Sequence, residues 1–189
     1  MFNILLDAFP DNWKGCKINT DFRIGIMICL ASSDAELSET DKANVIMNLL
    51  FDDEIPDEME IAECVDWFLN GWTHDRHSKG SGVSVMDFDS DDGRIYTAFL
   101  SQYGIDLNTA EMHFWRFMHL LTNLEECAFT RVIDIRAKKI DGKMSKEERK
   151  YYTDAKRIYA INKDEEKSIE QKIAEQEVTD EFLSFIQKK

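Results

Sequence analysis

Histidines and clustered carboxylates are the side chains in this sequence whose spacing could support chemistry. His74 and His77 lie three residues apart on either side of Asp75, but neither a Cys pair nor a His-Glu-x-x-His motif accompanies them. His113 and His119 are six residues apart, so in a helix they project from different faces and cannot easily share a proton. The histidines therefore predict neither a metal centre nor an acid–base pair.

The acidic run from Asp87 to Gly93 has an oxygen spacing close to that of a calcium loop. A calcium loop also requires a glutamate at its twelfth position, which is missing, and Ile95–Leu100 already has a helical pattern. Carboxylates in this position are better explained as stabilising the positive end of a helix. We find no nucleophile–base motif and no phosphate-binding loop, so the sequence predicts no catalytic, cofactor-binding or metal-binding residues and a protein that is not an enzyme.

Composition favours a helical protein with a substantial core. Of the 189 residues, 43% are hydrophobic, while Gly at 8 and Pro at 2 are too few for a turn-rich β fold. No apolar run approaches the length that spans a bilayer, and the first residues lack the pattern of a signal peptide. The cysteines form no Cys-x-x-Cys pair, which predicts small buried thiols in a reducing cytoplasm, at Cys16, Cys29, Cys64 and Cys127.

The net charge of −14 is unevenly distributed along the chain. Residues 1–130 contain 8 basic and 24 acidic residues, whereas residues 131–163 contain 11 basic and 5 acidic ones. An acidic body repels phosphate groups, so we expect neither nucleic-acid nor membrane binding. The basic block could contact an anionic partner, but a solvated helix face that complements its acidic neighbours is the more frequent explanation.

Turn residues and apolar spacing predict how the N-terminal half is organised. The apolar runs on either side of PDNWKG predict a short β-hairpin over residues 2–18. A first helix begins near Thr20, and a second is capped by Ser38 or Thr40. A third has Pro56 at its first position and ends at Gly71. The first of these helices should face inward with Phe22, Ile26 and Cys29 or Leu30.

The second half begins with a different kind of segment and then returns to helices. Residues 73–90 predict a flexible loop that ends in a short extended piece. A helix over Asp91–Tyr103, ended by Gly104, follows. Further helices are expected over Asn108–Leu121, where Glu111 would complete a reciprocal cap, over Glu125–Arg136, and after Ser145, whose capping partner is Glu148.

These patterns predict a mainly α protein: a compact multi-helix domain over residues 1–161 with a short N-terminal hairpin. Residues 162–189 differ in composition and predict a charged tail, partly helical or disordered. Near the end of this tail, an apolar cluster that includes Phe182 and Phe185 is unusual for a solvating segment. It could dock on the body, on another copy of the chain or on a partner.

Four segments in order resemble the bacteriophage gene-product-fifteen family, from long, non-contractile-tailed phages and prophages of Gram-positive hosts. They are INTDFR at Ile18–Arg23, IYTAFLSQYGIDL at Ile95–Leu107, HFWRFMHLL at His113–Leu121 and KEERKYYTDAKRIYAI at Lys146–Ile161. The resemblance spans roughly residues 1–161. It implies tail morphogenesis, as a tail assembly chaperone that coats the tape measure protein before the tail tube polymerises. It also implies action in the host bacterial cytoplasm and absence from the finished virion.

Aromatic side chains at helical spacing are the candidate contacts for the tape measure protein and other tail proteins, because aromatic residues dominate interface energetics. The same spacing is more often explained by core packing. Other functions remain open: a structural component of the tail or connector, an acidic mimic of DNA, or a small enzyme, and the protein could form a homo-oligomer. The candidate protein-binding residues are Tyr96, Phe99, Tyr103, Trp115, Tyr159, Phe182 and Phe185.

Overall fold

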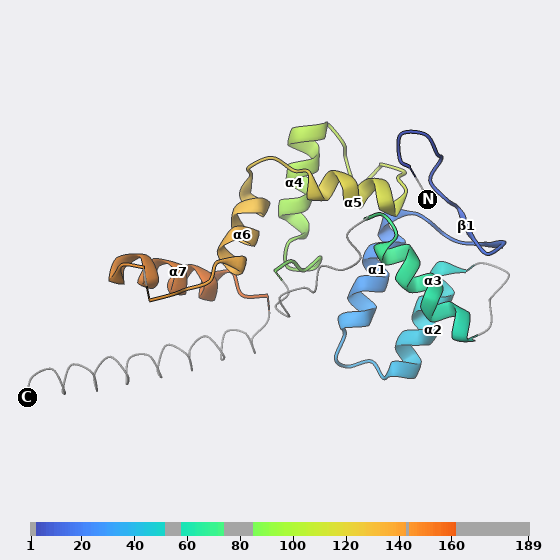
Figure 1. The fold of residues 1–189 in the computed structure, drawn as a ribbon, viewed down its shortest axis with the longest axis horizontal. Coiled ribbons are helices and arrows are strands. Elements are labelled where there is room, and N and C mark those ends of the chain that lie inside the picture. The colour runs from blue at the N-terminus through green and yellow to red at the C-terminus, as the bar shows by residue number, and fades with distance from the viewer. Residues whose placement is uncertain (1–2, 52–57, 74–84, 143, 162–189) are drawn as a thin grey trace, which may run out of the picture. The chain divides into compact units, whose positions relative to one another are not determined.

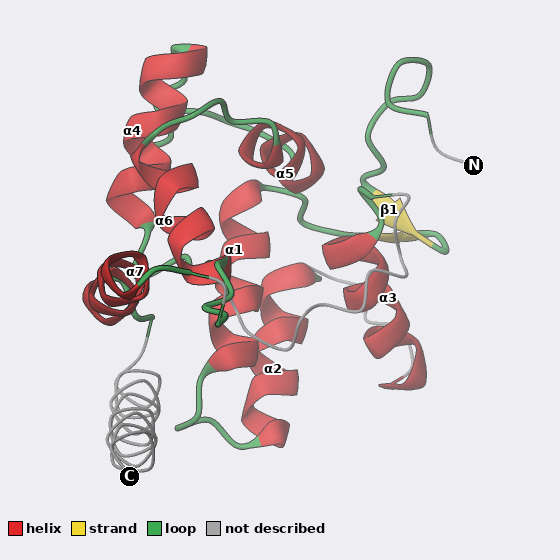
Figure 2. Ribbon diagram, turned by 60° about the vertical axis from the view of Figure 1, so that its left-hand side comes forward, coloured by secondary structure: helices red, strands yellow, loops and turns green. Residues whose placement is uncertain are grey.

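The computed structural model describes residues 3–51, 58–73, 85–142 and 144–161. The protein is mainly α, with one two-stranded hairpin near the N-terminus among these residues (Figures 1 and 2). Its chain contacts divide it into two units, which are described separately. Unit 1 comprises residues 1–80 and 92–125, and unit 2 comprises residues 81–91 and 126–189. The tail at 162–189, most of the loop at 73–90 and Pro56 lie outside the described residues.

Unit 1 contains the hairpin and five helices within its described residues. The elements are β1 (Asn12–Trp13), β2 (Cys16–Lys17), α1 (Phe22–Ser33), α2 (Glu39–Leu50), α3 (Glu58–Asn70), α4 (Asp92–Tyr103) and α5 (Phe114–Thr122). Ser38, rather than Thr40, caps α2 by accepting a hydrogen bond from the Asp41 amide. Gly104 follows α4 with φ 65°, and its amide bonds to the Leu100 carbonyl, so the predicted glycine stop is confirmed.

The predicted hairpin exists but is shorter than expected. Lys14 and Gly15 both have positive φ, as a tight two-residue hairpin turn requires, and they join β1 to β2. The expected strand near residues 2–6 is wrong. The side chains of Asn3 and Asp7 bond to the amides of Leu5 and Asn3, and these local bonds form a turn where a strand ladder would need free amides.

The core of unit 1 is a cluster of stacked aromatic rings. Phe117 stacks on Phe22 and on Phe99, with ring centroids 5.0 Å apart in both pairs. Trp115 is fully buried, and its indole N–H donates to the Phe68 carbonyl at 2.7 Å. Aromatic rings bury large apolar areas, so this cluster contributes strongly to the core of unit 1. The indole N–H of Trp115 keeps a hydrogen-bond partner in the core.

The inward face of α1 differs in part from the expectation. Phe22, Gly25 and Ile28 are the buried residues, whereas Ile26, Cys29 and Leu30 are only part-buried. The ring of Phe114 lies directly against Gly25, so the missing side chain lets α5 approach α1 closely. The expected inward face of α1 was based on hydrophobic side chains, and glycine is not strongly hydrophobic. Gly25 was therefore left out of that face.

The predicted helix over Asn108–Leu121 is also wrong at its start, because α5 begins only at Phe114. Backbone bonds join this segment to the start of α1: the Phe22 amide donates to the Met112 carbonyl, and the Phe114 amide donates to the Thr20 carbonyl. Glu111 is exposed and caps nothing, while His113 caps α5. An antiparallel bridge between Asp21 and His113 therefore joins the chain just before α5 to the chain at the start of α1.

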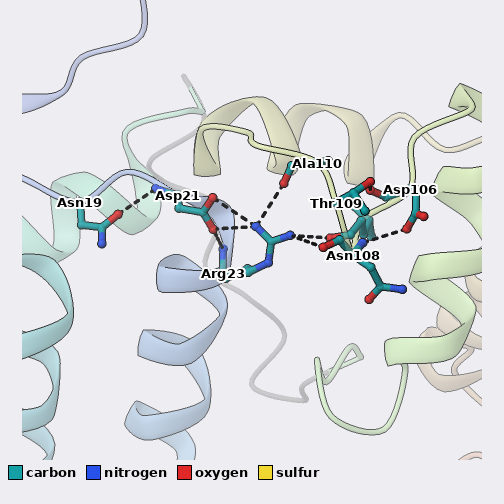
Figure 3. Close-up of polar contacts among 8 residues, drawn as sticks. Asn19, Asp21, Arg23, Asp106, Asn108, Thr109 and Ala110 are labelled. Atoms are coloured by element: carbon teal, nitrogen blue, oxygen red, sulfur yellow. Dashed lines mark hydrogen bonds and ion pairs between the residues drawn. The ribbon is translucent and has the colours of Figure 1, made fainter.

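Arg23 fixes the rest of this non-helical segment (Figure 3). Its guanidinium donates to the carbonyls of Leu107 at 2.7 Å, Ala110 at 3.1 Å and Asn108 at 3.3 Å, and it pairs with the Asp21 carboxylate. A helix over these residues would use the same carbonyls for its own amides. Arg23 satisfies these carbonyls in the non-helical conformation, so the helix is not needed to supply their hydrogen bonds.

Unit 2 contains α6 (Ala128–Ala137) and α7 (Lys146–Ile158). The predicted capping box at the start of α7 is confirmed: Ser145 accepts from the Glu148 amide, and the Glu148 carboxylate accepts from the Ser145 amide. The extended piece expected at the end of the 73–90 loop forms no strand over its described residues, 85–90. Across the described ranges, no helix is both long and apolar enough to cross a bilayer.

We predict that Gly25→Ala destabilises unit 1 by about 1–3 kcal/mol, because a Cβ at this position collides with the Phe114 ring in a packed core. Gly93→Ala is the matched control, since nothing lies within 4 Å of its Cβ position in α4. This variant should be neutral or stabilising by up to about 1 kcal/mol. Urea denaturation followed by circular dichroism measures both. Equal effects would contradict the close approach of α1 and α5.

His113 predicts a loss of stability in mild acid. Its Nδ1 accepts from the Trp115 amide at 3.0 Å and its Nε2 lies 2.9 Å from the Pro10 carbonyl, an arrangement that needs the neutral ring with the proton on Nε2. Burial lowers the pKa of His113, against smaller raising effects of the Pro10 carbonyl and Asp11. The unfolded state therefore takes up the proton more readily than the folded state. The contribution of His113 to the free energy of unfolding should be complete above about pH 6.5 and should be lost as the pH falls through the lower pKa of the folded state.

The measurement is the free energy of unfolding in urea between pH 7.5 and pH 5. His113→Asn keeps a helix-capping acceptor but does not titrate. This variant should be less stable than wild type at pH 7.5, because it loses the stacking of Phe9 on the ring, and its stability should fall less steeply with acid. The same slope in both proteins would show that His113 is not the titrating group.

Candidate protein-binding surfaces

A buried ion pair holds unit 2 together and positions the surface described next. Both terminal nitrogens of Arg136 bond to the Asp91 carboxylate, at 2.6 and 3.2 Å, with Asp91 0% exposed and Arg136 7% exposed. The same guanidinium donates to the carbonyls of Val85 and Tyr159. Lys156 on α7 donates to the carbonyl of Arg136 on α6 at 2.6 Å. This network joins the segment before α4, the end of α6 and the end of α7.

A shallow groove lies between α6 and α7, which we call the α6–α7 groove. Its wall carries three cationic side chains and one carboxylate together with apolar and aromatic groups. Basic charge here contrasts with the acidic composition of residues 1–130. The groove is lined by Arg131, Asp134, Ile135, Ala137, Lys138, Lys139, Tyr151 and Tyr152.

Two adjacent tyrosines give the groove its aromatic surface. The rings of Tyr151 and Tyr152 meet edge to face with centroids 5.2 Å apart, and the Lys138 ammonium lies 5.4 Å from the Tyr152 ring centroid. Tyr151 is 61% exposed, and Ile158, seven residues later on the same side of α7, is 71% exposed. The groove thus combines positive charge with apolar area, a combination suited to an acidic segment that carries bulky side chains.

Unit 1 presents a second surface, the N-terminal apolar turn, which comprises Ile4, Leu5 and Leu6. Leu5 is 87% exposed and Leu6 is 82% exposed. Hydrogen bonds from the Leu6 and Asp7 amides to the Asn3 carbonyl fix the turn that carries them. Consecutive aliphatic side chains held in water are a feature of surfaces that bind other proteins.

The structure places the predicted contact residues differently from one another. Phe99 and Trp115 are buried in the core of unit 1, where they stack on or lie beside other rings. Tyr96, Tyr103 and Tyr159 are part-buried. The Tyr103 hydroxyl donates to the Leu120 carbonyl at 2.9 Å, and the Tyr159 carbonyl accepts from Arg136. Whether any of these residues contacts a partner stays a prediction.

Phe182 and Phe185 lie outside the described residues. The more exposed groups, Tyr151 and the N-terminal apolar turn, were absent from the predicted set. A helical wheel of α7 could have found Tyr151, because it lies beside the less exposed face that Tyr152 and the buried Ala155 form. No sequence signal marks Leu5 and Leu6 as exposed, since an apolar run of this kind also predicts a β-strand.

The cysteine thiols and the possible metal ligands were compared with what catalysis or metal binding would require. Burial raises the pKa of Cys29 to about 11, and burial with a smaller effect of Cys16 raises the pKa of Cys64 to about 12. Both thiols are therefore protonated and weakly nucleophilic at neutral pH. No three His, Cys, Asp or Glu side chains of the described residues come together as a metal site would require, and His74 and His77 lie outside them.

The described residues thus define a mainly α protein that exposes an apolar turn in unit 1 and a basic, tyrosine-lined groove in unit 2. The chain belongs to the bacteriophage Gp15 protein family, whose model matches residues 5–161. It is a bacteriophage protein, and the family indicates a role in the structure or assembly of the phage particle. No curated protein and no solved structure matches the chain.

We predict that Asp91→Asn destabilises the protein by about 3–5 kcal/mol, because it leaves the buried Arg136 guanidinium without its counter-charge. Asp92→Asn is the matched control. Asp92 is the exposed neighbour in the first turn of α4, and its change should cost less than about 1 kcal/mol. Urea denaturation measures both. Equal small losses would show that the ion pair does not hold unit 2 together.

Proposed function

We propose that this protein is a tail assembly chaperone that binds the tape measure protein of its phage before the tail tube polymerises. Resemblance to the gene-product-fifteen family supports this role, since its members are generally encoded between the major tail protein and the tape measure protein. The observation that carries the proposal is the N-terminal apolar turn, with Leu5 and Leu6 at 87% and 82% exposure. A chaperone needs apolar groups that are held out in water and ready to cover those of its client.

The acidic charge of the chain supports the same role. A tape measure protein is a long amphipathic chain that aggregates when it is left bare. A protein of net charge −14 that covers it confers mutual repulsion on the complexes and keeps them dispersed. The protein acts in the host cytoplasm during assembly, by binding rather than by catalysis, and leaves before the virion is complete.

Co-expression with the tape measure protein of the same phage tests the proposal. The soluble fraction of the tape measure protein should rise severalfold in the presence of the wild-type chain. Leu5→Ser with Leu6→Ser should abolish most of this gain, because the exposed aliphatic area is lost. Sedimentation followed by quantitative blotting measures the soluble fraction.

Leu100→Ser is the matched control, since Leu100 is 45% exposed on α4 and lies outside the turn. This variant should retain the gain in solubility. Equal precipitation with and without the wild-type chain would refute the chaperone role. Mass spectrometry of purified virions tests the alternative: stoichiometric presence in the particle would establish a structural component of the tail or connector instead.

A further inference from the structure

The α6–α7 groove is a built surface with an unusual combination of properties. Arg131, Lys138 and Lys139 are exposed and line the groove together with Tyr151, a residue that is 61% exposed. Among the described residues, Asp134 contributes a carboxylate to the groove wall, and Glu126 pairs with Arg131. An occupant of this groove should therefore carry carboxylates next to large apolar side chains.

The chain itself contains a segment of this chemistry. Asp180 and Glu181 directly precede the apolar residues Phe182, Leu183, Phe185 and Ile186. Residues 164–189 contain 8 acidic and 4 basic residues, so their net charge is opposite to that of the groove. No other stretch after α7 places two carboxylates beside aromatic residues.

Covalent connection makes this segment a strong competitor for the groove. Tyr151 lies seven residues before the end of α7 at Ile158, about 10 Å along the helix, and Ile161 follows three residues later. Residues 162–179 separate Ile161 from Asp180, and an unstructured chain of that length has a root-mean-square span of about 25 Å. A segment tethered at this range has an effective concentration of about 1 mM, which outcompetes free partners of moderate affinity.

We propose that residues 180–186 of this chain dock in the α6–α7 groove of the same molecule, with Phe182 and Phe185 against Tyr151 and with Asp180 and Glu181 facing Lys138 and Lys139. Docking covers the most exposed aromatic ring of the groove and neutralises its cations. The groove is then closed to other acidic partners until one of them displaces the segment. This inference does not depend on the chaperone role, because it concerns the protein alone.

Hydrogen–deuterium exchange of the full-length chain tests the proposal. If the segment binds its groove with a dissociation constant near about 0.1 mM, a tether of about 1 mM leaves about a tenth of the molecules open. Amides of residues 180–186 should then exchange roughly tenfold faster in Phe182→Ser with Phe185→Ser than in wild type. Ile169→Ser with Ile173→Ser, elsewhere in the tail, is the matched control and should leave their exchange unchanged.

Charge reversal in the groove provides the complementary variant. Lys138→Glu with Lys139→Glu should accelerate exchange over 180–186 to the same extent, whereas Lys146→Glu with Lys150→Glu, exposed on α7 outside the groove wall, should not. Unchanged circular dichroism and melting temperature verify that each variant is folded. Wild-type protection should persist over a fiftyfold dilution and weaken in high salt.

Each contrary result overturns the proposal in a distinct way. Protection that is lost on dilution would show that the segment docks on a second copy. Exchange that is fast in wild type and unaffected by either variant would show that the groove has no occupant from this chain. No tape measure protein is present in these measurements, so neither outcome bears on the chaperone role.

Discussion

Satisfaction of backbone carbonyls by arginine is the constraint on which both units of this protein depend. In unit 1, Arg23 bonds to the carbonyls of Leu107, Asn108 and Ala110, and in unit 2, Arg136 bonds to those of Val85 and Tyr159. Each segment is irregular and part-buried, so its carbonyls have no ladder or helix to receive them. A carboxylate balances each guanidinium, from Asp21 or from Asp91. Two arginines therefore let a helical protein contain ordered non-helical chain.

This arrangement separates the residues that stabilise the fold from those available for binding. Aromatic rings of unit 1 pack against one another in its core, where Phe117 stacks on both Phe22 and Phe99. The N-terminal apolar turn and the α6–α7 groove are the candidate surfaces for partners. The turn is held by local hydrogen bonds at Asn3, and the groove is set by the Arg136 network and Lys156. Binding surfaces on rigid supports lose little entropy when a partner docks.

Local signals predicted the helices well where a cap and a stop were both present. Gly104 ends α4, and Ser145 with Glu148 begins α7, because caps act within a few residues and do not need the rest of the fold. The predicted helix start was wrong where residues far away in the sequence form hydrogen bonds with the segment. Asn108 and Glu111 formed a plausible cap, but Met112 and Phe114 bond to the chain at the start of α1. The aromatic stripe of α4 was more often explained by core packing than by a binding surface, and Phe99 lies in the core.

The sequence by itself determined the helical class, the family and the bounds of most helices, because periodicity and capping are properties of neighbouring residues. It also determined the contrast between an acidic body and a basic block. Only the tertiary structure decided which aromatic rings are exposed, as Tyr151 is and Trp115 is not. It likewise decided that Gly25 faces the core and that Asp91 pairs with Arg136. Burial and pairing depend on residues far apart in the chain, and no local pattern contains that information.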